Sequence, residues 1–500
     1  MNVKLTGSFE TKRGMVRGYC QDEEVLVFKG IPYAAPPVGD LRWKEAVPHP
    51  EWDGVLDCVE FGNSAPQNPM DEVSQLVWTE EFQIQNRNFS EDCLTLNLWT
   101  KKDGKDMPVV VYFYGGGYVS GGSSCPIYDG TELVKNGIIY VTFNHREGTL
   151  ALLAAEGLAE ESESGKSGNY MLSDDILALK WVKENIRAFG GDPENVTIWG
   201  QSSGAGQVNA LSVSPMAKGL FKQVISMGYN NYEDYIFGKC WLDYSKACEQ
   251  GQGILDSLGC DVEEARKKDF GEFLKLPQMG VIQIDGRYIP GDFKSSIKDG
   301  RMDGIPFMMG AVPGDTVVAV FVRSYSGSED KAEFKAHAAK FFGEENAEKI
   351  FKAYDLENRT VKEAMGKLKE DLLLATMLSF AEGRKERGDA DKTFVYYFVH
   401  PMPGPMMQRF GAFHSCEVPY FLNYFSPLRD EYWKEEDFAL GRTASAELIS
   451  FIKTGKPKDA GFTNSDGSNY FRIDAGEMEN MVMDEKIRDL WLGIFKGGMR

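Results

Sequence analysis

The sequence predicts an α/β protein built on a mostly parallel central sheet with helices on both faces. Three short apolar runs without polar alternation, at residues 108–114, 137–144 and 195–200, are typical of strands buried on both faces of a sheet. A helical pattern precedes the third run. This strand, helix, strand order implies right-handed crossovers between parallel strands, with helices covering both faces.

The first hundred residues alternate β-rich and turn-rich segments. The runs VLVFKGIPYA (25–34) and TLNLWT (95–100) are separated by stretches such as PPVGD. This pattern predicts strands that lead into the sheet.

The clearest helical pattern covers residues 173–193. Its apolar side is formed by Ile176, Leu177, Leu179, Trp181, Val182 and Ile186. Ser173, followed by two aspartates, predicts the start of the helix, and Gly190-Gly191 with Pro193 predicts its end.

Two later segments, at about 230–300 and 328–390, are charged and helical in pattern. We interpret them as helical insertions that cover one end of the sheet. The 500 residues contain no internal repeat, low-complexity linker or break in composition. The sequence therefore predicts one elaborated domain over residues 1–500.

The charge balance argues against polyanionic partners. The net charge of -20 repels phosphate backbones and anionic lipid, so we expect neither nucleic acid nor a membrane as partner. The N-terminal stretch has no apolar core of a signal peptide, and no later run reaches the roughly 18 apolar residues of a membrane span. We expect a cytoplasmic protein, a monomer or small homo-oligomer, that acts on a small molecule.

The eight cysteines are scattered without CxxC pairs or other metal-ligand spacing. They make up a small share of a long chain, unlike the cysteines of a disulfide scaffold. We expect free thiols and no metal site.

The segment Gly200-Gln201-Ser202-Ser203-Gly204 is the candidate nucleophile turn. The motif G-x-S-x-G alone is also compatible with a solvated turn. Here a buried strand precedes it and a helical pattern follows, which is the context of a strained elbow that exposes the serine Oγ. The following helix adds positive dipole at the reacting centre. The sequence predicts Ser202 as the nucleophile.

Three glycines, Gly115-Gly116-Gly117, directly follow the buried run 108–114. The N–H groups of Gly116 and Gly117, with that of Ser203, are predicted to converge on a developing oxyanion. The alternatives are a flexible turn or a phosphate loop. No Lys-Ser/Thr follows and the G-x-G-x-x-G spacing is absent, so an oxyanion hole is the preferred interpretation.

The general base must lie downstream of the nucleophile. Where a serine nucleophile stands on a turn between a strand and a helix, the order along the chain is Ser, then Asp or Glu, then His. Three histidines qualify. His337 lies in a helical pattern, most simply on a solvated face, and His400 ends an apolar run as a strand-edge residue. His414 lies in a loop between Gly411 and an apolar segment. It is therefore the predicted base, with a satisfied loop histidine as the alternative.

Asp315 is the predicted acid. It is the sole carboxylate in a turn that follows the apolar run 305–312. Its role would be to fix the tautomer of the histidine and to stabilise the imidazolium. The alternative is an ordinary turn or helix-cap aspartate.

Several long segments together resemble the type-B carboxylesterase family, which includes cholinesterases, bacterial p-nitrobenzyl-type esterases and the non-catalytic neuroligins. The segments are 28–43, 90–99, 112–122, 178–206, 413–421 and 451–459. The resemblance implies an α/β-hydrolase fold over nearly the whole chain. It also implies a triad of Ser202, Asp315 and His414 with the oxyanion donors named above.

The resemblance further implies a structural salt bridge between Arg42 and Glu91. Cys93 matches a cysteine that is disulfide-bonded in secreted members of the family, but its partner position holds Ala65. This disulfide is therefore not expected.

The chain also departs from the family pattern around the triad. Gln201 stands where the family usually has Glu, and the choline-binding tryptophan of cholinesterases falls near Phe82 or Gln83. Asp315 stands where most cholinesterases carry Glu, and Met227 replaces a serine that commonly supports the acid, a role for which Ser226 is an open alternative.

Together these features predict a serine carboxylesterase that hydrolyses neutral carboxylic esters through an acyl-enzyme on Ser202, without metal or cofactor. An amidase or thioesterase with the same triad is the alternative within hydrolases. A neuroligin-like binding protein is the alternative outside them, but such proteins lose the nucleophile.

Overall fold

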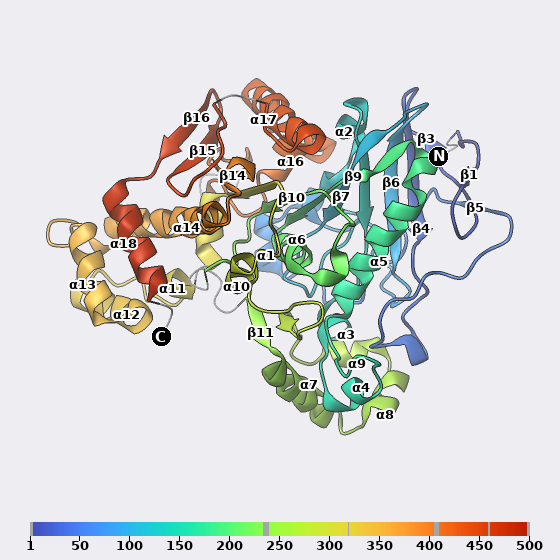
Figure 1. The fold of residues 1–500 in the computed structure, drawn as a ribbon, viewed down its shortest axis with the longest axis horizontal. Coiled ribbons are helices and arrows are strands. Elements are labelled where there is room, and N and C mark those ends of the chain that lie inside the picture. The colour runs from blue at the N-terminus through green and yellow to red at the C-terminus, as the bar shows by residue number, and fades with distance from the viewer. Residues whose placement is uncertain (1–3, 234–239, 319, 405–409, 459–460, 498–500) are drawn as a thin grey trace.

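An eleven-stranded mixed sheet crosses the molecule (Figure 1). The computed structural model describes residues 4–233, 240–318, 320–404, 410–458 and 461–497. The strand order is β16 (Glu477–Val482), β15 (Asn469–Asp474), β14 (Thr393–Phe398), β13 (Phe307–Ala311), β10 (Gln223–Met227), β9 (Gly191–Gln201), β7 (Met107–Phe113), β8 (Ile139–Phe143), β6 (Thr95–Lys101), β4 (Val25–Pro32) and β3 (Tyr19–Cys20).

The middle of the sheet is parallel and its two edges are antiparallel. Every neighbouring pair from β15 to β8 runs parallel. The pairs β15–β16, β8–β6, β6–β4 and β4–β3 run antiparallel. The runs that predicted buried strands became β7, β8 and β9, and the early β-rich runs became β4 and β6. The fold class predicted from the sequence is confirmed.

Strand β7 shows how one strand serves two hydrophobic cores. Val109 and Val111 pack into one core, whereas Val110 and Tyr112 pack into the other, and all are almost fully buried. Successive side chains of a strand point to opposite faces, so a strand covered on both sides needs apolar residues at every position. This requirement explains the uninterrupted apolar run.

Helices cover both faces of the sheet (Figure 1). Apolar side chains of α5 (Tyr170–Asn185), α6 (Ser203–Val213), α14 (Val361–Glu386) and α18 (Glu485–Lys496) join the core that contains Val109 and Val111. Apolar side chains of α2 (Thr131–Lys135), α16 (Val418–Leu422) and α17 (Glu435–Thr454) join the core on the opposite face.

The start predicted at Ser173 is wrong, whereas Gly190, in the left-handed conformation, ends the helical stretch as predicted. Helix α5 begins at Tyr170 and ends at Asn185, and the stretch that follows is a 3-10 helix and then β9. Ser173 lies inside the helix, where its Oγ accepts a hydrogen bond from the N–H of Ala46 at 2.7 Å. Asp174 is buried in an ion pair with Arg146. These polar residues serve tertiary partners instead of capping the helix.

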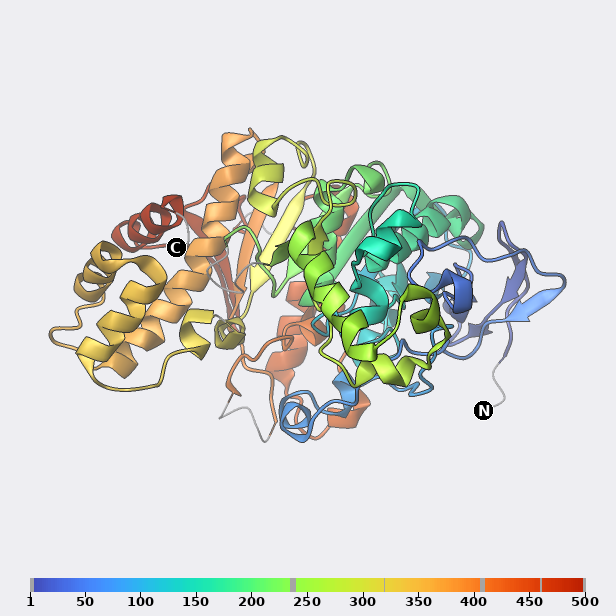
Figure 2. The ribbon, with the colours of Figure 1, turned by 90° about the horizontal axis from the view of Figure 1, so that it is seen from below.

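Helices occupy most of both ranges interpreted as insertions, and residues 234–239 of the first range lie outside the described chain. The helices are α7 (Tyr244–Leu258), α8 (Val262–Lys267), α9 (Phe270–Leu274), α10 (Phe293–Lys298), α12 (Lys331–Phe342), α13 (Glu344–Ala353) and α14. Seen from below, α12, α13 and α18 lie at one end of the molecule and the N-terminal strands at the other (Figure 2). In the described chain no helix is both long and apolar enough to cross a membrane.

Candidate active site

The predicted site residues lie on loops that follow neighbouring parallel strands. Gly116 follows β7, Ser202 follows β9, Asp315 follows β13, and His414 lies between β14 and α16. These strands are adjacent or one strand apart in the sheet. Because the carboxyl ends of parallel strands share one edge, the loops gather there, where open α/β sheets bind their ligands.

Ser202 sits in a strained turn between β9 and α6. Its φ of 57° and ψ of -128° lie in a region that L-residues seldom occupy. The N–H of Ser202 donates to the carbonyl of Met227 at 2.8 Å, which ties the turn to β10. A Cβ on Gly204 would collide with the carbonyl oxygen of Phe113. Glycine there lets the turn pack against β7, which places Ser202 at the strand ends.

The glycine loop packs directly beside this turn. A Cβ on Gly115 would lie 2.6 Å from the Cβ of Ser202. Gly116 and Gly117 have φ values of 153° and 67°, which glycine adopts without steric cost. Among the described residues no hydrogen bond uses the N–H of either glycine. Ser203 is the first residue of α6, a position whose N–H has no partner within a helix.

Asp315 and His414 form a direct pair. Nδ1 of His414 lies 2.5 Å from Oδ1 of Asp315, and Oδ2 of Asp315 accepts the N–H of Val312 at 2.9 Å. The carboxylate can only accept, so Nδ1 carries the proton and Nε2 of the neutral ring carries a lone pair. Burial opposes the charged ring, but the carboxylate outweighs burial, so the pKa of His414 is raised above its ordinary value.

The other side of the His414 ring faces the nucleophile turn. Nε2 of His414 lies 3.4 Å from Nε2 of Gln201, the residue before Ser202. The indole N–H of Trp78 donates to the carbonyl of His414 at 3.3 Å. Asp315, Gln201 and Trp78, from three segments distant in sequence, therefore meet at His414.

The remaining downstream histidines lie in other settings. His337 is not on a solvated face as predicted, because its Nε2 lies 2.9 Å from the carbonyl oxygen of Phe321 and its ring packs on that phenyl ring. His400 lies two residues after the end of β14, and its Nε2 lies 2.9 Å from Oδ1 of Asp437. The hydroxyl of Ser226 donates to the carbonyl of Tyr229, so it does not take the supporting role left open for it beside Asp315.

Sequence reasoning missed Glu417. Its side chain is fully buried, and neither carboxyl oxygen has a hydrogen-bond partner in the described chain. Burial, with the nearby charge of Asp315, raises the pKa of Glu417 to about 8. This carboxyl is therefore neutral at pH 7. Its place three residues after His414 was the only signal in the sequence, and a sequence position does not reveal burial.

The variant Glu417→Gln is expected to gain stability relative to wild type as pH rises from about 5 to about 8. The unfolded chain ionises this carboxyl near pH 4.3, whereas the folded chain holds the proton until its pKa of about 8. Wild-type stability is therefore lost across this window. At about 1.4 kcal/mol per pKa unit, the gain between pH 5 and pH 8 should be about 4 kcal/mol. Urea unfolding at pH 5, 6.5 and 8 measures it, and a pH-independent difference would contradict the assignment.

Two structural features implied by the family resemblance can be compared with the structure. Arg42 and Glu91 form a buried bidentate ion pair. Cys93 is a free thiol, as are Cys20, Cys58, Cys125, Cys248, Cys260 and Cys416. The described residues contain no group of three or more His, Cys, Asp or Glu side chains that could hold a metal ion.

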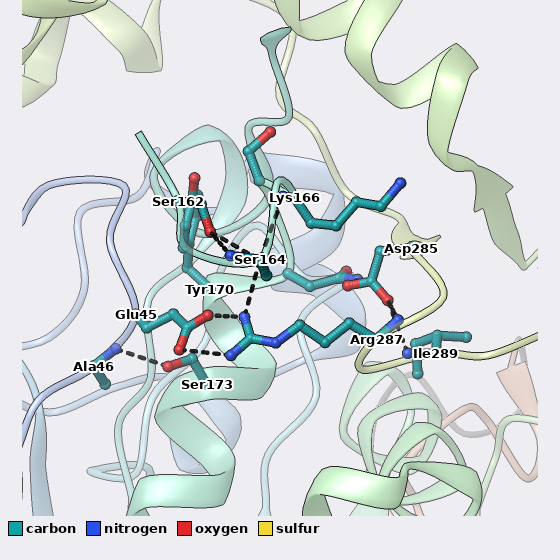
Figure 3. Close-up of polar contacts among 12 residues, drawn as sticks. Glu45, Ala46, Ser162, Ser164, Lys166, Tyr170, Ser173, Asp285, Arg287 and Ile289 are labelled. Atoms are coloured by element: carbon teal, nitrogen blue, oxygen red, sulfur yellow. Dashed lines mark hydrogen bonds and ion pairs between the residues drawn. The ribbon is translucent and has the colours of Figure 1, made fainter. Parts of the chain in front are cut away.

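A separate hollow of about 180 Å³ lies beside the start of α5, and Ser202, Asp315 and His414 do not line it. Figure 3 shows its charged side chains. Arg287 lies against Glu45 in a bidentate ion pair, and Asp285 accepts the N–H groups of Arg287 and Ile289. The charges of Arg287 and Glu45 therefore neutralise each other, and backbone N–H groups satisfy Asp285. The triad region is the better candidate for the functional site.

The parallel sheet, the elbow at Ser202 and the paired Asp315 and His414 define an enzyme of the α/β-hydrolase fold. The sequence pattern of the Carboxylesterase family matches residues 6–488. The chain therefore belongs to the carboxylesterase family, whose members include carboxylic ester hydrolases.

Individual relatives agree with this placement. The para-nitrobenzyl esterase of Bacillus subtilis is 30% identical over 95% of this chain and 94% of its own length. The fumonisin B1 esterase of Sphingopyxis macrogoltabida is 40% identical over 54% of this chain, a match that spans 47% of that protein. A solved PNB esterase structure has a TM-score of 0.79 at 27% identity and covers 97% of this chain and 99% of its own.

Proposed function

We propose that this protein is a serine carboxylesterase that works through an acyl-enzyme on Ser202. The observation that carries the proposal is the pairing of His414 with Asp315 beside the strained turn of Ser202. With the proton on Nδ1, Nε2 of His414 carries the lone pair that acts as a base toward the turn.

In the proposed reaction, Ser202 Oγ attacks the ester carbonyl carbon while Nε2 of His414 takes the hydroxyl proton. The N–H groups of Gly116, Gly117 and Ser203 stabilise the negative oxygen, an effect worth about 3 kcal/mol for each donor in related sites. The C–O bond to the alcohol then breaks, and His414 returns the proton to the leaving oxygen. Water, deprotonated by the same ring, releases the acid. No metal or cofactor takes part.

The test is hydrolysis of p-nitrophenyl acetate, butyrate and longer esters by wild type and by Ser202→Ala. Undiminished activity in the variant would reject the proposal. Including a thioester and an anilide of the same acyl group separates an esterase from the thioesterase and amidase alternatives, which would use the same triad. A binding-only, neuroligin-like role would show no turnover on any of them.

We further propose that the preferred substrates are neutral esters. Gln201, almost fully buried beside the reacting residues, carries no charge. An isolated buried carboxylate at this position would attract a cationic alcohol group, since a charge pair a few ångströms apart is worth on the order of 3 kcal/mol at an effective dielectric constant of about 20. The amide offers no such attraction.

The variant Gln201→Glu is expected to favour cationic esters. Acetylcholine and 3,3-dimethylbutyl acetate have nearly the same shape but differ by one charge. The ratio of their kcat/KM values should rise about tenfold in favour of acetylcholine, equivalent to about 1.4 kcal/mol. An unchanged ratio would show that residue 201 does not set the charge preference.

The natural surroundings of the enzyme are also a matter of proposal. We propose a cytoplasmic location for a monomer or small homo-oligomer. The free thiol of Cys93, at a position that is disulfide-bonded in secreted members of the family, supports the location, because disulfides persist mainly in oxidising compartments.

A further inference from the structure

Gln201 occupies the gap between the base and the glycine loop. It is the last residue of β9 and is 2% exposed. A Cβ on Gly115 would lie 2.8 Å from its Oε1, and a Cβ on Gly228 would lie 3.3 Å from its Nε2 and 3.1 Å from Cε1 of His414. The amide oxygen therefore points toward the glycine loop and the amide nitrogen toward the imidazole.

This orientation matters because an amide nitrogen can only donate. Nε2 of Gln201 lies 3.4 Å from Nε2 of His414, and that ring nitrogen has a lone pair only while the ring is neutral. On protonation, Nε2–H of the ring would point at the amide N–H groups, donor against donor. The contact thus distinguishes the two protonation states of the base.

We propose that Gln201 is a positioning residue whose side-chain amide donates a hydrogen bond to Nε2 of His414 and so favours the neutral imidazole that can act as base. This inference rests on the proposed function of His414. Gln201 then affects the reaction of every substrate, in addition to its effect on the preference for neutral over cationic substrates. The enzyme also keeps its activity to lower pH than it would with a carboxylate at position 201.

The charges around the ring show why an amide differs from a carboxylate here. The titratable groups that face His414 in the described chain are Asp315 and Glu417. Asp315 favours the protonated ring, and Glu417 adds to this effect only once it ionises near pH 8. A glutamate at 201 would add another carboxyl group beside Nε2, accept a hydrogen bond from the imidazolium and favour it further. The side chain of Gln201 has almost the same size as that of glutamate, but its amide favours the neutral ring of His414.

The test compares the acid limb of kcat/KM for 3,3-dimethylbutyl acetate in wild type, Gln201→Met and Gln201→Glu. This limb reports the ionisation of the base in the free enzyme. Methionine removes the donor without adding charge, so the limb should move to higher pH by about half a unit. Glutamate should move it by about one unit or more. Coincident limbs, or the reverse order, would overturn the proposal.

A direct readout removes the dependence on turnover. The chain has five histidines, so 15N-histidine spectra can be assigned to His414 by comparison with His414→Asn. The imidazole of His414 should titrate in the same order, wild type below Met below Glu. A merely structural role would lower activity at every pH and leave the titration in place, which would also overturn the proposal.

The two proposals fail in different ways. If Ser202→Ala keeps full activity, the proposed esterase mechanism on Ser202 is rejected, whatever the titrations show. If Ser202→Ala is inactive but His414 titrates identically in the three proteins, the role of Gln201 falls alone. Melting temperatures of the variants within a few degrees of wild type would show that the fold is retained.

Discussion

Ser202→Ala is expected to lower kcat for p-nitrophenyl butyrate by roughly 10⁴- to 10⁶-fold while leaving the melting temperature nearly unchanged. The substitution removes only the hydroxyl group. Without it no acyl-enzyme can form, and the remaining rate depends on water, the oxyanion donors and substrate binding. The strained φ of 57° stays in place, because alanine has the same backbone preferences at this turn.

A matched control exists on α7. Ser257 is exposed, and its hydroxyl donates to the carbonyl of Gly253 within the same helix. Ser257→Ala also deletes one hydroxyl but should retain wild-type kcat/KM. If the two variants lost activity to the same extent, the loss would have to come from expression or folding. Burst-phase release of p-nitrophenol, proportional to enzyme, should disappear only in Ser202→Ala.

The sequence was informative where the local pattern and the fold impose the same requirement. The apolar run of β7 must satisfy two cores, so Val109 to Tyr112 identify it as a central strand. The turn at Ser202 needs a strand before it and a helix after it, and both are visible in the sequence. The order of the residues along the chain then selected Asp315 and His414. In the structure, Oδ1 of Asp315 lies 2.5 Å from Nδ1 of His414.

The sequence misled where polar residues have distant partners. Ser173 and Asp174 have the composition of a helix start, yet they bind Ala46 and Arg146, which are far away in the chain. Glu417 has the composition of a surface residue and is buried without a partner among the described residues. Burial and tertiary hydrogen bonds depend on the assembled fold, so local propensity cannot report them.

The same limit applies to Gln201. Its identity as a departure from the family pattern is visible in the sequence, but its contact with Nε2 of His414 requires the packing of β9 against the loop that follows β14. The oxyanion donors remain a prediction, supported by the backbone conformations of Gly116 and Gly117.

Asp315→Asn is expected to lower kcat roughly 10⁴-fold at neutral pH with little change in KM. Asparagine is nearly isosteric with aspartate, so the loss of activity would come from a changed position of the proton on the His414 ring. Oδ2 of Asp315 accepts the N–H of Val312 at 2.9 Å. In the variant only the amide oxygen can fill that role, so the amide NH₂ group must face Nδ1 of His414. Nδ1 then has to accept, and the proton moves to Nε2, where the base needs a lone pair.

Gln201 would deepen this loss. With the proton on Nε2, the ring presents a donor to the amide N–H of Gln201, so the site offers neither Ser202 nor Gln201 an acceptor. Asp315→Glu, which keeps a carboxylate, should retain much more activity than Asp315→Asn. Asp303→Asn, which breaks only an exposed ion pair with Arg387, should match wild type. Because 15N-histidine spectra distinguish the two tautomers, an Asp315→Asn enzyme that kept the Nδ1–H form, or more than a tenth of wild-type kcat, would show that Asp315 does not set the state of the base.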